Sequence, residues 1–155
     1  MPDLKYTSYG ARLSELPLSE SKNETTGNNL AEVFPYRLLV VDDEQDVLEA
    51  LADILIIQGH DVTAVSSGSE ALSALQAERF DGLLSDMRMP GMDGPQLYDA
   101  VKERFPEMAR RTAFVTGDDL SKTARSFLNS CNRPSLGKPF SPDQVAQLIE
   151  EMGLS

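Results

Sequence analysis

Phe80-Asp-Gly-Leu-Leu-Ser-Asp86-Met-Arg-Met-Pro-Gly-Met-Asp-Gly94 is the stretch of sequence that decides the fold. Its apolar pair Leu83-Leu84 leads into the carboxylate of Asp86, and a Pro90-Gly91 turn follows. This order predicts a buried strand that ends at an acidic residue, then a loop, then a helix that begins near Pro95. In an open parallel sheet, ligands bind at the carboxyl ends of the strands. Asp86 therefore stands where a reactive group is expected.

Apolar runs and helical patterns alternate along the chain from Arg37 onward. The apolar, β-branched runs predict strands at 37–41, 61–65, 112–116 and 135–138, besides the strand that ends at Asp86. Helical spacing of apolar residues and N-terminal caps predict five helices, which begin near residues 44, 67, 95, 120 and 141. Strict alternation predicts an α/β fold, in which helices cover both faces of a five-stranded parallel sheet.

The chain divides by composition into a polar N-terminal part and the alternating part. Residues 1–36 include a polar stretch from Ser19 to Asn29 and are predicted to be a flexible tail or linker. Residues 37–155 are predicted to form one domain. The formal net charge of -11 argues against binding to nucleic acid or to anionic membranes. The single cysteine, and the lack of a membrane-spanning apolar run, favour a cytoplasmic location.

A second pair of carboxylates, Asp42 and Asp43, ends the apolar run Leu38-Leu-Val-Val41. If this strand lies beside the strand of Asp86, three carboxylates converge at one edge of the sheet. At about 4 Å, each pair of like charges costs roughly 4 kcal/mol at an effective dielectric constant near 20. A divalent cation would relieve this repulsion. Carboxylate and carbonyl oxygens favour Mg²⁺, so a magnesium site is predicted.

Two further strand ends contribute polar groups to the same edge. Thr116 provides a hydroxyl group after the run Ala113-Phe-Val115, and Lys138 provides a cation after the fifth strand. Carboxylates, a metal ion, a hydroxyl group and a lysine together suit phosphoryl transfer to a carboxylate. Each residue also has a structural interpretation when taken alone. Asp42 and Asp43 could cap a helix, Thr116 could be a strand former, and Lys138 could be a solvated charge.

Four motifs carry a resemblance to the receiver domains of two-component systems: Val41-Asp-Asp-Glu44, Ser85-Asp86-Met-Arg-Met-Pro-Gly-Met-Asp-Gly94, Thr116-Gly117 and Lys138-Pro-Phe140. The resemblance covers residues 37–153. It implies a flavodoxin-like (βα)5 sandwich with strand order 2-1-3-4-5. It also implies that Asp86 accepts a phosphoryl group from the phosphohistidine of a histidine kinase or phosphotransfer domain.

The same resemblance implies further roles for individual residues. Asp43, Asp86 and the backbone carbonyl of Arg88 would bind Mg²⁺ directly, and Asp42 would act largely through water. Thr116 and Lys138 would contact the phosphoryl group, and the Lys138-Pro139 bond would be cis. One position departs from the family pattern. Ser135 stands three residues before the lysine, where the family usually has Phe or Tyr as a rotating switch side chain. Gly117, where the family often has alanine, would leave more room beside the phosphoryl group.

Several local assignments follow from short patterns. Ser67 with Glu70, and Ser141 with Gln144, have the spacing of capping boxes. His60 follows the helix-ending Gly59 and is predicted to be an exposed turn residue. The remaining local assignments are a cap of the third helix at Asp93, caps of the fourth helix at Asp118 and Asp119, a loop position for the unpaired Cys131, and packing within the loop for Met87, Met89 and Met92.

Two other functions remain open at this stage. A Mg²⁺-dependent aspartyl phosphatase also uses a strand-end aspartate, but it often needs a second acid two residues later, where this chain has Arg88. A pseudo-receiver that only binds a partner would not need the complete set of site residues. The Tyr9–Leu18 stretch and the Arg133–Phe140 run favour a receiver fused to a hybrid histidine kinase over a single-domain regulator. Homodimerisation through the helix four, strand five and helix five face is a further alternative.

Overall fold

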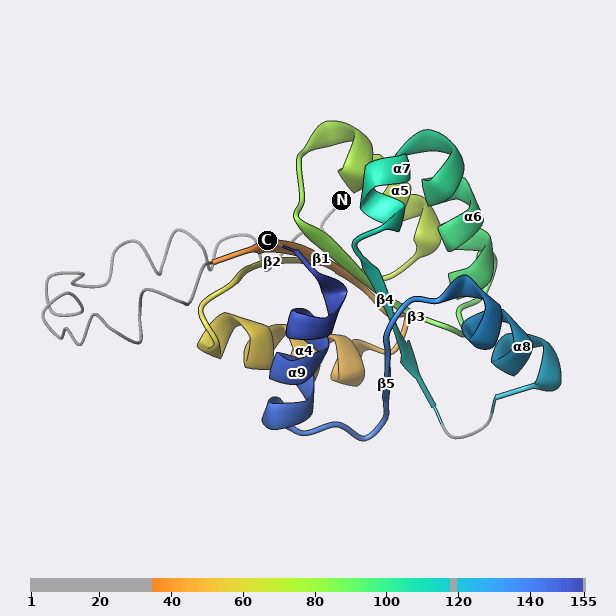
Figure 1. Cartoon of the computed structure of the whole chain (residues 1–155). Helices are drawn as coiled ribbons and strands as arrows, with labels where there is room; N and C mark the ends of the chain where they lie inside the picture. The colour runs from red at the N-terminus through yellow and green to blue at the C-terminus, as the bar shows by residue number, and fades with distance from the viewer. Residues whose placement is uncertain (1–34, 118–119, 155) are drawn as a thin grey trace, which may run out of the picture.

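Five parallel strands form one sheet in the order β2-β1-β3-β4-β5, in a computed structural model that describes residues 35–117 and 120–154 (Figure 1). This is the predicted order. The strands are β1 (Arg37–Val41), β2 (Asp61–Val65), β3 (Gly82–Asp86), β4 (Thr112–Thr116) and β5 (Ser135–Gly137). Each lies parallel to its neighbours in the sheet. Four of the five strands therefore have the predicted carboxyl end, and β5 ends one residue early.

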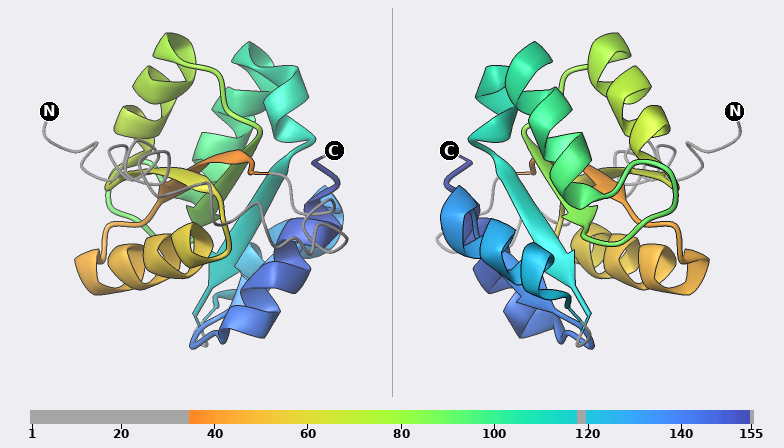
Figure 2. Two further views of the ribbon diagram at one scale, coloured as in Figure 1. Left: turned by 90° about the vertical axis from the view of Figure 1, so that its left-hand side faces the viewer. Right: turned by 90° about the vertical axis from the view of Figure 1, so that its right-hand side faces the viewer.

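Helices cover both faces of this sheet, so the described part of the chain has three layers (Figure 2). One face is covered by α4 (Gln45–Ile57) and α9 (Pro142–Met152). The other face is covered by α5 (Gly68–Ala77), α6 (Gly94–Arg104), the short α7 (Pro106–Ala109) and α8 (Lys122–Cys131). The fold confirms the predicted flavodoxin-like sandwich.

The apolar run of β1 shows why polar and apolar residues do not alternate along a central parallel strand. Leu38 and Val40 pack into the core beneath α4 and α9, whereas Leu39 and Val41 pack into the core on the opposite face. All four side chains are at most 1% exposed. Both faces of a parallel sheet are buried, so successive residues of its inner strands are all apolar.

Side-chain caps fix where most of the helices begin. Both parts of the capping box are present at Asp93 with Gln96 of α6, and at Ser141 with Gln144 of α9. The box predicted at Ser67 forms only in part. The Ser67 hydroxyl accepts a hydrogen bond from the backbone N–H of Glu70, but the carboxylate of Glu70 accepts from Ser66. Ser121 caps α8, and the predicted caps Asp118 and Asp119 lie outside the described residues.

The prediction for His60 was wrong. Its side chain is only 6% exposed, stacks on the ring of Tyr36 at 5.5 Å between centroids, and accepts a hydrogen bond from the Tyr36 backbone N–H. Gly59 has the positive φ expected of a helix-ending glycine, but the residue that follows it is buried rather than exposed. Burial lowers the pKa of His60 from its ordinary value.

Smaller differences concern the other helices. Pro106 ends α6 as predicted, but it also begins the additional turn of α7. Leu120 precedes α8 instead of lying within it, and Cys131 is the last residue of α8 rather than a loop residue. No helix in the described ranges has the length and apolar character that crossing a membrane requires. Residues 1–34 of the predicted tail lie outside the described part of the chain.

Candidate acidic site at the carboxyl edge of the sheet

The predicted site residues lie at one edge because four neighbouring strands end there. Asp42 follows β1, Asp86 ends β3, Thr116 ends β4, and Lys138 follows β5. Backbone hydrogen bonds hold these ends in register. The N–H of Asp42 donates to Val65 at 3.2 Å, and the N–H of Lys138 donates to the carbonyl of Thr116 at 2.8 Å. The sheet therefore places a hydroxyl group, a cation and carboxylates side by side.

Three carboxylates converge as the sequence predicted. Oxygen atoms of Asp42, Asp43 and Asp86 all lie within 4.8 Å of one another. Asp42 is 2% exposed and Asp86 is 5% exposed, whereas Asp43 is open to solvent. Such a set of hard oxygen ligands suits a small divalent cation.

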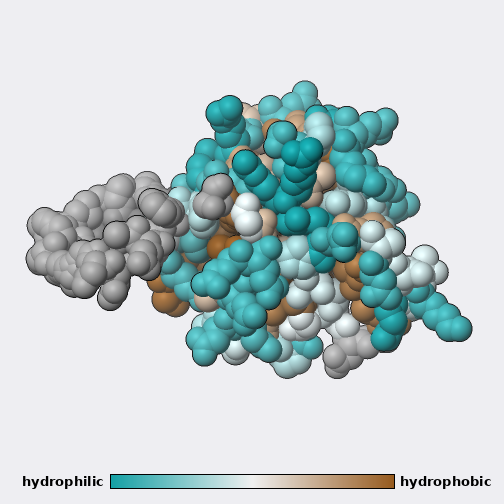
Figure 3. Space-filling model, viewed as in Figure 1, coloured by the Kyte–Doolittle hydropathy of each residue, from teal (hydrophilic) through white to brown (hydrophobic). Residues whose placement is uncertain are grey.

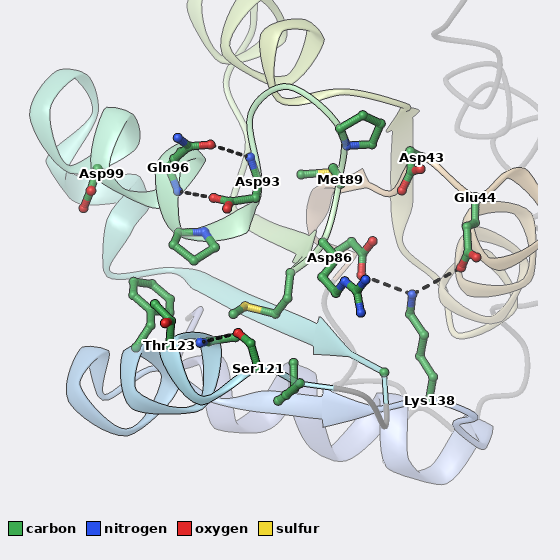
Figure 4. A pocket seen from close by; sticks show the side chains of 18 residues that line it. Asp43, Glu44, Asp86, Met89, Asp93, Gln96, Asp99, Ser121, Thr123 and Lys138 are labelled. Atoms are coloured by element: carbon green, nitrogen blue, oxygen red, sulfur yellow. Dashed lines mark hydrogen bonds and ion pairs between the residues drawn. The ribbon is translucent and has the colours of Figure 1, made fainter.

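Lys138 supplies the positive charge that faces this cluster. Its Nζ atom lies 3.1 Å from Oδ1 of Asp86, 3.2 Å from Oδ2 of Asp42 and 3.6 Å from Oε1 of Glu44. Figure 4 shows the lysine side chain pointing toward the carboxylates of Asp86 and Glu44. The Lys138-Pro139 peptide bond that follows is cis, as expected. One ammonium group thus offsets part of the charge of three carboxylates.

Burial and charge shift the pKa values of these groups. Burial raises the pKa of Asp42 to about 6, although a hydrogen bond from the Glu44 N–H and the charge of Lys138 oppose the rise. Burial also raises the pKa of Asp86, against the opposing influence of Lys138. For Lys138, burial alone would lower the pKa, but Asp42 and Asp86 together outweigh it and the pKa is raised. The site therefore favours the protonated form of Lys138 and disfavours the state in which Asp42 and Asp86 are both ionised.

The loop from Met87 to Asp93 is shaped by a close approach of α6 to the backbone of Asp86. A Cβ atom added at Gly94 would lie 2.6 Å from the carbonyl oxygen of Asp86 and 2.9 Å from the Cα of Met87. Gly91, with φ of 80°, provides the turn within the loop. Met87 and Met89 are buried in the core between the sheet and α5 and α6, and Met92 packs against that core, so all three have a packing role that extends beyond the loop. A glycine at position 94 is therefore a steric requirement of the site.

A groove with a volume of about 1220 Å³ opens at Asp86 and is lined by residues of α6 and α8. Lys138, Arg88 and Gly117 line it near the carboxylates, and Phe127 lines it on the side of α8. A Cβ atom added at Gly117 would meet nothing within 4 Å, so the space beside this residue is open, as its sequence suggested. Thr116 is 8% exposed and does not line the groove.

Sequence reasoning missed one participant, Glu44. Its side chain lies 3.6 Å from the Lys138 ammonium group, and its backbone N–H donates to Asp42. Its position directly after Asp42-Asp43 was a signal that it could reach the same edge. Arg88 lines the groove. Its backbone carbonyl stays a predicted ligand of the metal ion.

Comparison with known proteins agrees with this geometry. Residues 38–150 match the family model described as the response regulator receiver domain. Response regulator protein FleR of Pseudomonas aeruginosa is 42% identical over 118 residues, which are 76% of this chain and 24% of that protein. Sensor protein GacS of Pseudomonas syringae pv. syringae is 34% identical over 140 residues, which are 88% of this chain and 15% of that protein.

A solved structure shares the fold. The response regulator receiver domain protein (CheY-like) from Methanospirillum hungatei superimposes with a TM-score of 0.68 at 26% identity, over 77% of this chain and 95% of that one. The chain spans less than a quarter of the length of FleR and of GacS, so it corresponds to one part of each. The matching sequence, the strand order and the strand-end carboxylates together place this chain in the response regulator receiver domain family, the phosphoacceptor domains of two-component signalling.

Proposed function

We propose that Asp86 is the residue that accepts the phosphoryl group. The observation that carries this proposal is the contact between the buried Asp86 carboxylate and the Lys138 ammonium group at the open end of the groove. A carboxylate oxygen of Asp86 would attack the phosphorus atom of a phosphohistidine. The P–N bond breaks as the P–O bond forms, and the electron pair of the P–N bond stays on the imidazole nitrogen of the donor.

Mg²⁺ fits the acidic cluster because two of its three carboxylates are buried and their charges are only partly offset by Lys138. Asp43 and Asp86 would hold the ion directly with the backbone carbonyl of Arg88, and Asp42 would hold it through water. A bound Mg²⁺ would supply positive charge to the oxygen atoms of the phosphoryl group. The protein's contribution is to keep the carboxylates together at the strand ends before the donor arrives.

Lys138 and Thr116 would bind the oxygen atoms of the transferred group. The ammonium group of Lys138 already lies within hydrogen-bond distance of Asp86, so it need move little to contact a phosphoryl group there. The Thr116 hydroxyl would bind another oxygen. The absence of a side chain at Gly117 leaves room for the phosphoryl group and for an approaching donor.

The donor would be a histidine kinase or a phosphotransfer domain, and the parent protein a hybrid kinase. The alignment with sensor protein GacS supports the second point, since it covers 88% of this chain, more than residues 37–155 alone could supply. Part of the N-terminal segment therefore lies within the alignment with that sensor protein. The expected location is the cytoplasm.

Labelling with a small phosphodonor tests the assignment of Asp86. With Mg²⁺ and acetyl phosphate, intact-mass spectrometry should detect one added phosphoryl group, which is stable to acid and labile to base. Asp86→Asn should abolish the added mass. Asp93→Asn is the matched control, because it removes a groove carboxylate while asparagine remains a good helix cap. Undiminished labelling of Asp86→Asn would refute the proposal.

A further inference from the structure

His60 is a buried ionisable side chain that takes no part in the acidic site. It directly precedes β2, and Tyr36 directly precedes β1, at the amino ends of two neighbouring strands. Asp42 and Asp86 lie at the opposite, carboxyl ends. The imidazole ring is 6% exposed and stacks on the ring of Tyr36, with an angle of 15° between the two planes. The two side chains therefore meet where the chain enters the sheet.

The hydrogen bond between these residues depends on the protonation state of His60. Its Nδ1 atom accepts from the backbone N–H of Tyr36 at 3.1 Å. A ring nitrogen that accepts carries no proton, so this contact requires the neutral imidazole with its proton on Nε2. After protonation both ring nitrogens are donors. Two N–H groups would then face each other, and the Tyr36 N–H would lose its acceptor.

Tyr36 is the residue through which the preceding segment joins the described part of the chain. Pro35 is exposed and has no N–H to donate, so the N–H of Tyr36 is the first backbone donor among the described residues. On the side of the molecule seen in Figure 3, most of the described surface is hydrophilic and apolar side chains form only separate areas. The position of this entry point therefore depends on the half-buried ring and the N–H of Tyr36.

Other contacts hold β1 in the sheet without His60. The carbonyl of Tyr36 accepts from the N–H of Asp61 at 2.9 Å, and the N–H of Arg37 donates to a carboxylate oxygen of Asp81 at 2.8 Å. Neither bond involves the imidazole. Loss of the contact with His60 would therefore free the ring and the N–H of Tyr36 and leave β1 paired with β2.

Burial, rather than a neighbouring charge, lowers the pKa of His60 from its ordinary value of 6.5. The N–H of His60 donates to Leu55 of α4, and Tyr36 packs against the core beneath α4 and α9. The carboxylates of these two helices are all exposed, and those in their last two turns are Asp53, Glu150 and Glu151. On the strands, Arg37 and Asp61 pair with each other at 3.8 Å. Solvent screens these exposed charges, so burial against Tyr36 is what sets the titration of His60.

We propose that His60 is a pH-sensitive latch on the segment that precedes the domain. Neutral His60 binds Tyr36 through its ring and its Nδ1 atom, which fixes how the chain enters β1. Uptake of a proton from solvent at Nδ1 breaks the hydrogen bond. Because an imidazolium ion is disfavoured in a buried position, the ring turns toward solvent and the stacked pair separates. The entry of the chain is then released while the sheet stays intact, and Asp86 takes no part in this step.

NMR spectroscopy of the full chain, labelled with ¹⁵N, tests the latch between about pH 4.5 and 7.5. The Tyr36 amide and the His60 ring should titrate with one common midpoint, which lies below 6.5. Protection of the Tyr36 N–H from exchange, relative to the intrinsic rate at each pH, should fall roughly tenfold below that midpoint. Protection of the Asp61 N–H, which pairs β2 with β1, should not fall.

Variants assign the change to His60. In His60→Asn, an amide oxygen can accept from Tyr36 but cannot titrate, so the protection of Tyr36 should not depend on pH. Asp61→Asn removes the carboxylate next to His60, and Asp42→Asn removes the carboxyl group whose pKa is raised to about 6. Both are matched controls and should keep the wild-type response. In Tyr36→Ala the imidazole loses its cover, and its midpoint should move toward 6.5.

Several results would overturn the latch. Equal protection of Tyr36 on both sides of the His60 midpoint would show that its N–H does not depend on the imidazole. A loss of protection that persists in His60→Asn would assign the change to another group. Equal losses at Tyr36 and Asp61 would show that the sheet opens as a whole. If His60→Asn does not fold, an unchanged midpoint in Tyr36→Ala is the contradicting result. Labelling of Asp86 is independent of all of them.

Discussion

The ammonium group of Lys138 lies 3.1 Å from a carboxylate oxygen of Asp86 and bridges it to Asp42, whose oxygen lies 3.2 Å away. One cation therefore joins the end of β3 to the end of β1. Because the lysine is also 18% exposed at its side chain, solvent reaches this contact, and its strength is below that of a fully buried pair. The lysine and a metal ion would compete for the same carboxylate oxygens.

Lys138→Met should therefore have opposite effects on metal binding and on phosphorylation. The metal-free fold should lose about 1–3 kcal/mol of unfolding free energy, because two buried carboxylates lose a charged partner. Affinity for Mg²⁺ should rise, since no cation competes with it, while labelling by acetyl phosphate should fall. Calorimetric titration and intact-mass spectrometry measure these quantities. Lys122→Met, at an exposed position of α8, is the control. A variant with weaker Mg²⁺ binding would contradict the competition.

The raised pKa of Asp42 predicts how pH acts on the metal-free protein. Its folded pKa, about 6, is above the ordinary value of 3.8, so its stabilising contribution is complete below 3.8 and is lost as pH rises through 6. Mg²⁺ binding should strengthen over the same rise. Asp42→Asn keeps an oxygen acceptor for the Glu44 N–H and should remove this pH dependence. Urea unfolding of both proteins without metal is the measurement, and equal slopes against pH would contradict the prediction.

The sequence predicted the parts of the fold that depend on local patterns. The strand that ends at Asp86 was readable because Leu83-Leu84 is an apolar run followed by a loop signal, and the structure places the strand end there. The strand order came from the resemblance of the four motifs to receiver domains, because crossover handedness only limits the possible topologies. That order places β1 beside β3, and Asp42, Asp43 and Asp86 converge there. Parallel strands then bring their carboxyl ends together without any further information.

Features that depend on contacts between distant side chains were not predictable in this way. His60 follows a glycine turn, and only the packing of Tyr36 against it determines that the ring is buried. The rings of Tyr98, Phe114 and Phe127, from α6, β4 and α8, contact one another edge-to-face, and no local pattern encodes their relative orientation. The second arm of the Ser67 capping box failed because the Glu70 carboxylate has an alternative donor one residue away, at Ser66.

His60 should titrate below its ordinary value of 6.5, because burial disfavours its charged form. Its contribution to stability is complete above 6.5 and is lost as pH falls below that value, opposite in sign to that of Asp42. The chain has one histidine, so a proton NMR titration reports it without overlap. His60→Asn retains a hydrogen-bond acceptor but cannot titrate, and should lack this loss of stability. A titration midpoint at or above 6.5 would contradict the prediction.

Gly94→Ala should damage the acidic site through the backbone. The added methyl group would overlap the carbonyl of Asp86 and the Cα of Met87, which cannot rotate away. Overpacking of this kind costs roughly 1–3 kcal/mol and should displace the loop after β3. Labelling at Asp86 should slow and the unfolding free energy should fall. Gly137→Ala is the control, because nothing lies within 4 Å of its added Cβ atom. Equal behaviour of the two variants would show that the close approach has no effect.

Ser135 predicts a weak response of β5 and α9 to phosphorylation. In the family pattern, the threonine moves toward the phosphoryl group, and an aromatic side chain on the fifth strand turns into the space it leaves. Burying such a side chain is worth roughly 1.5–3 kcal/mol, enough to bias a two-state equilibrium, and serine cannot supply this term. Ser135 is exposed in this structure. In β5, only the next residue, Leu136, is buried.

Hydrogen exchange with beryllofluoride should therefore change less across residues 133–150 than in the loops around Arg88 and Gly117. Ser135→Phe should enlarge the change across 133–150, because it restores an apolar side chain that can fill the space beside Thr116. Tyr36→Phe, directly before the amino end of β1, should leave the pattern of hydrogen exchange as it is in the wild type. A wild-type response that is strongest across 133–150, with little change around Arg88 and Gly117, would show that this chain does not need the aromatic side chain to use that surface.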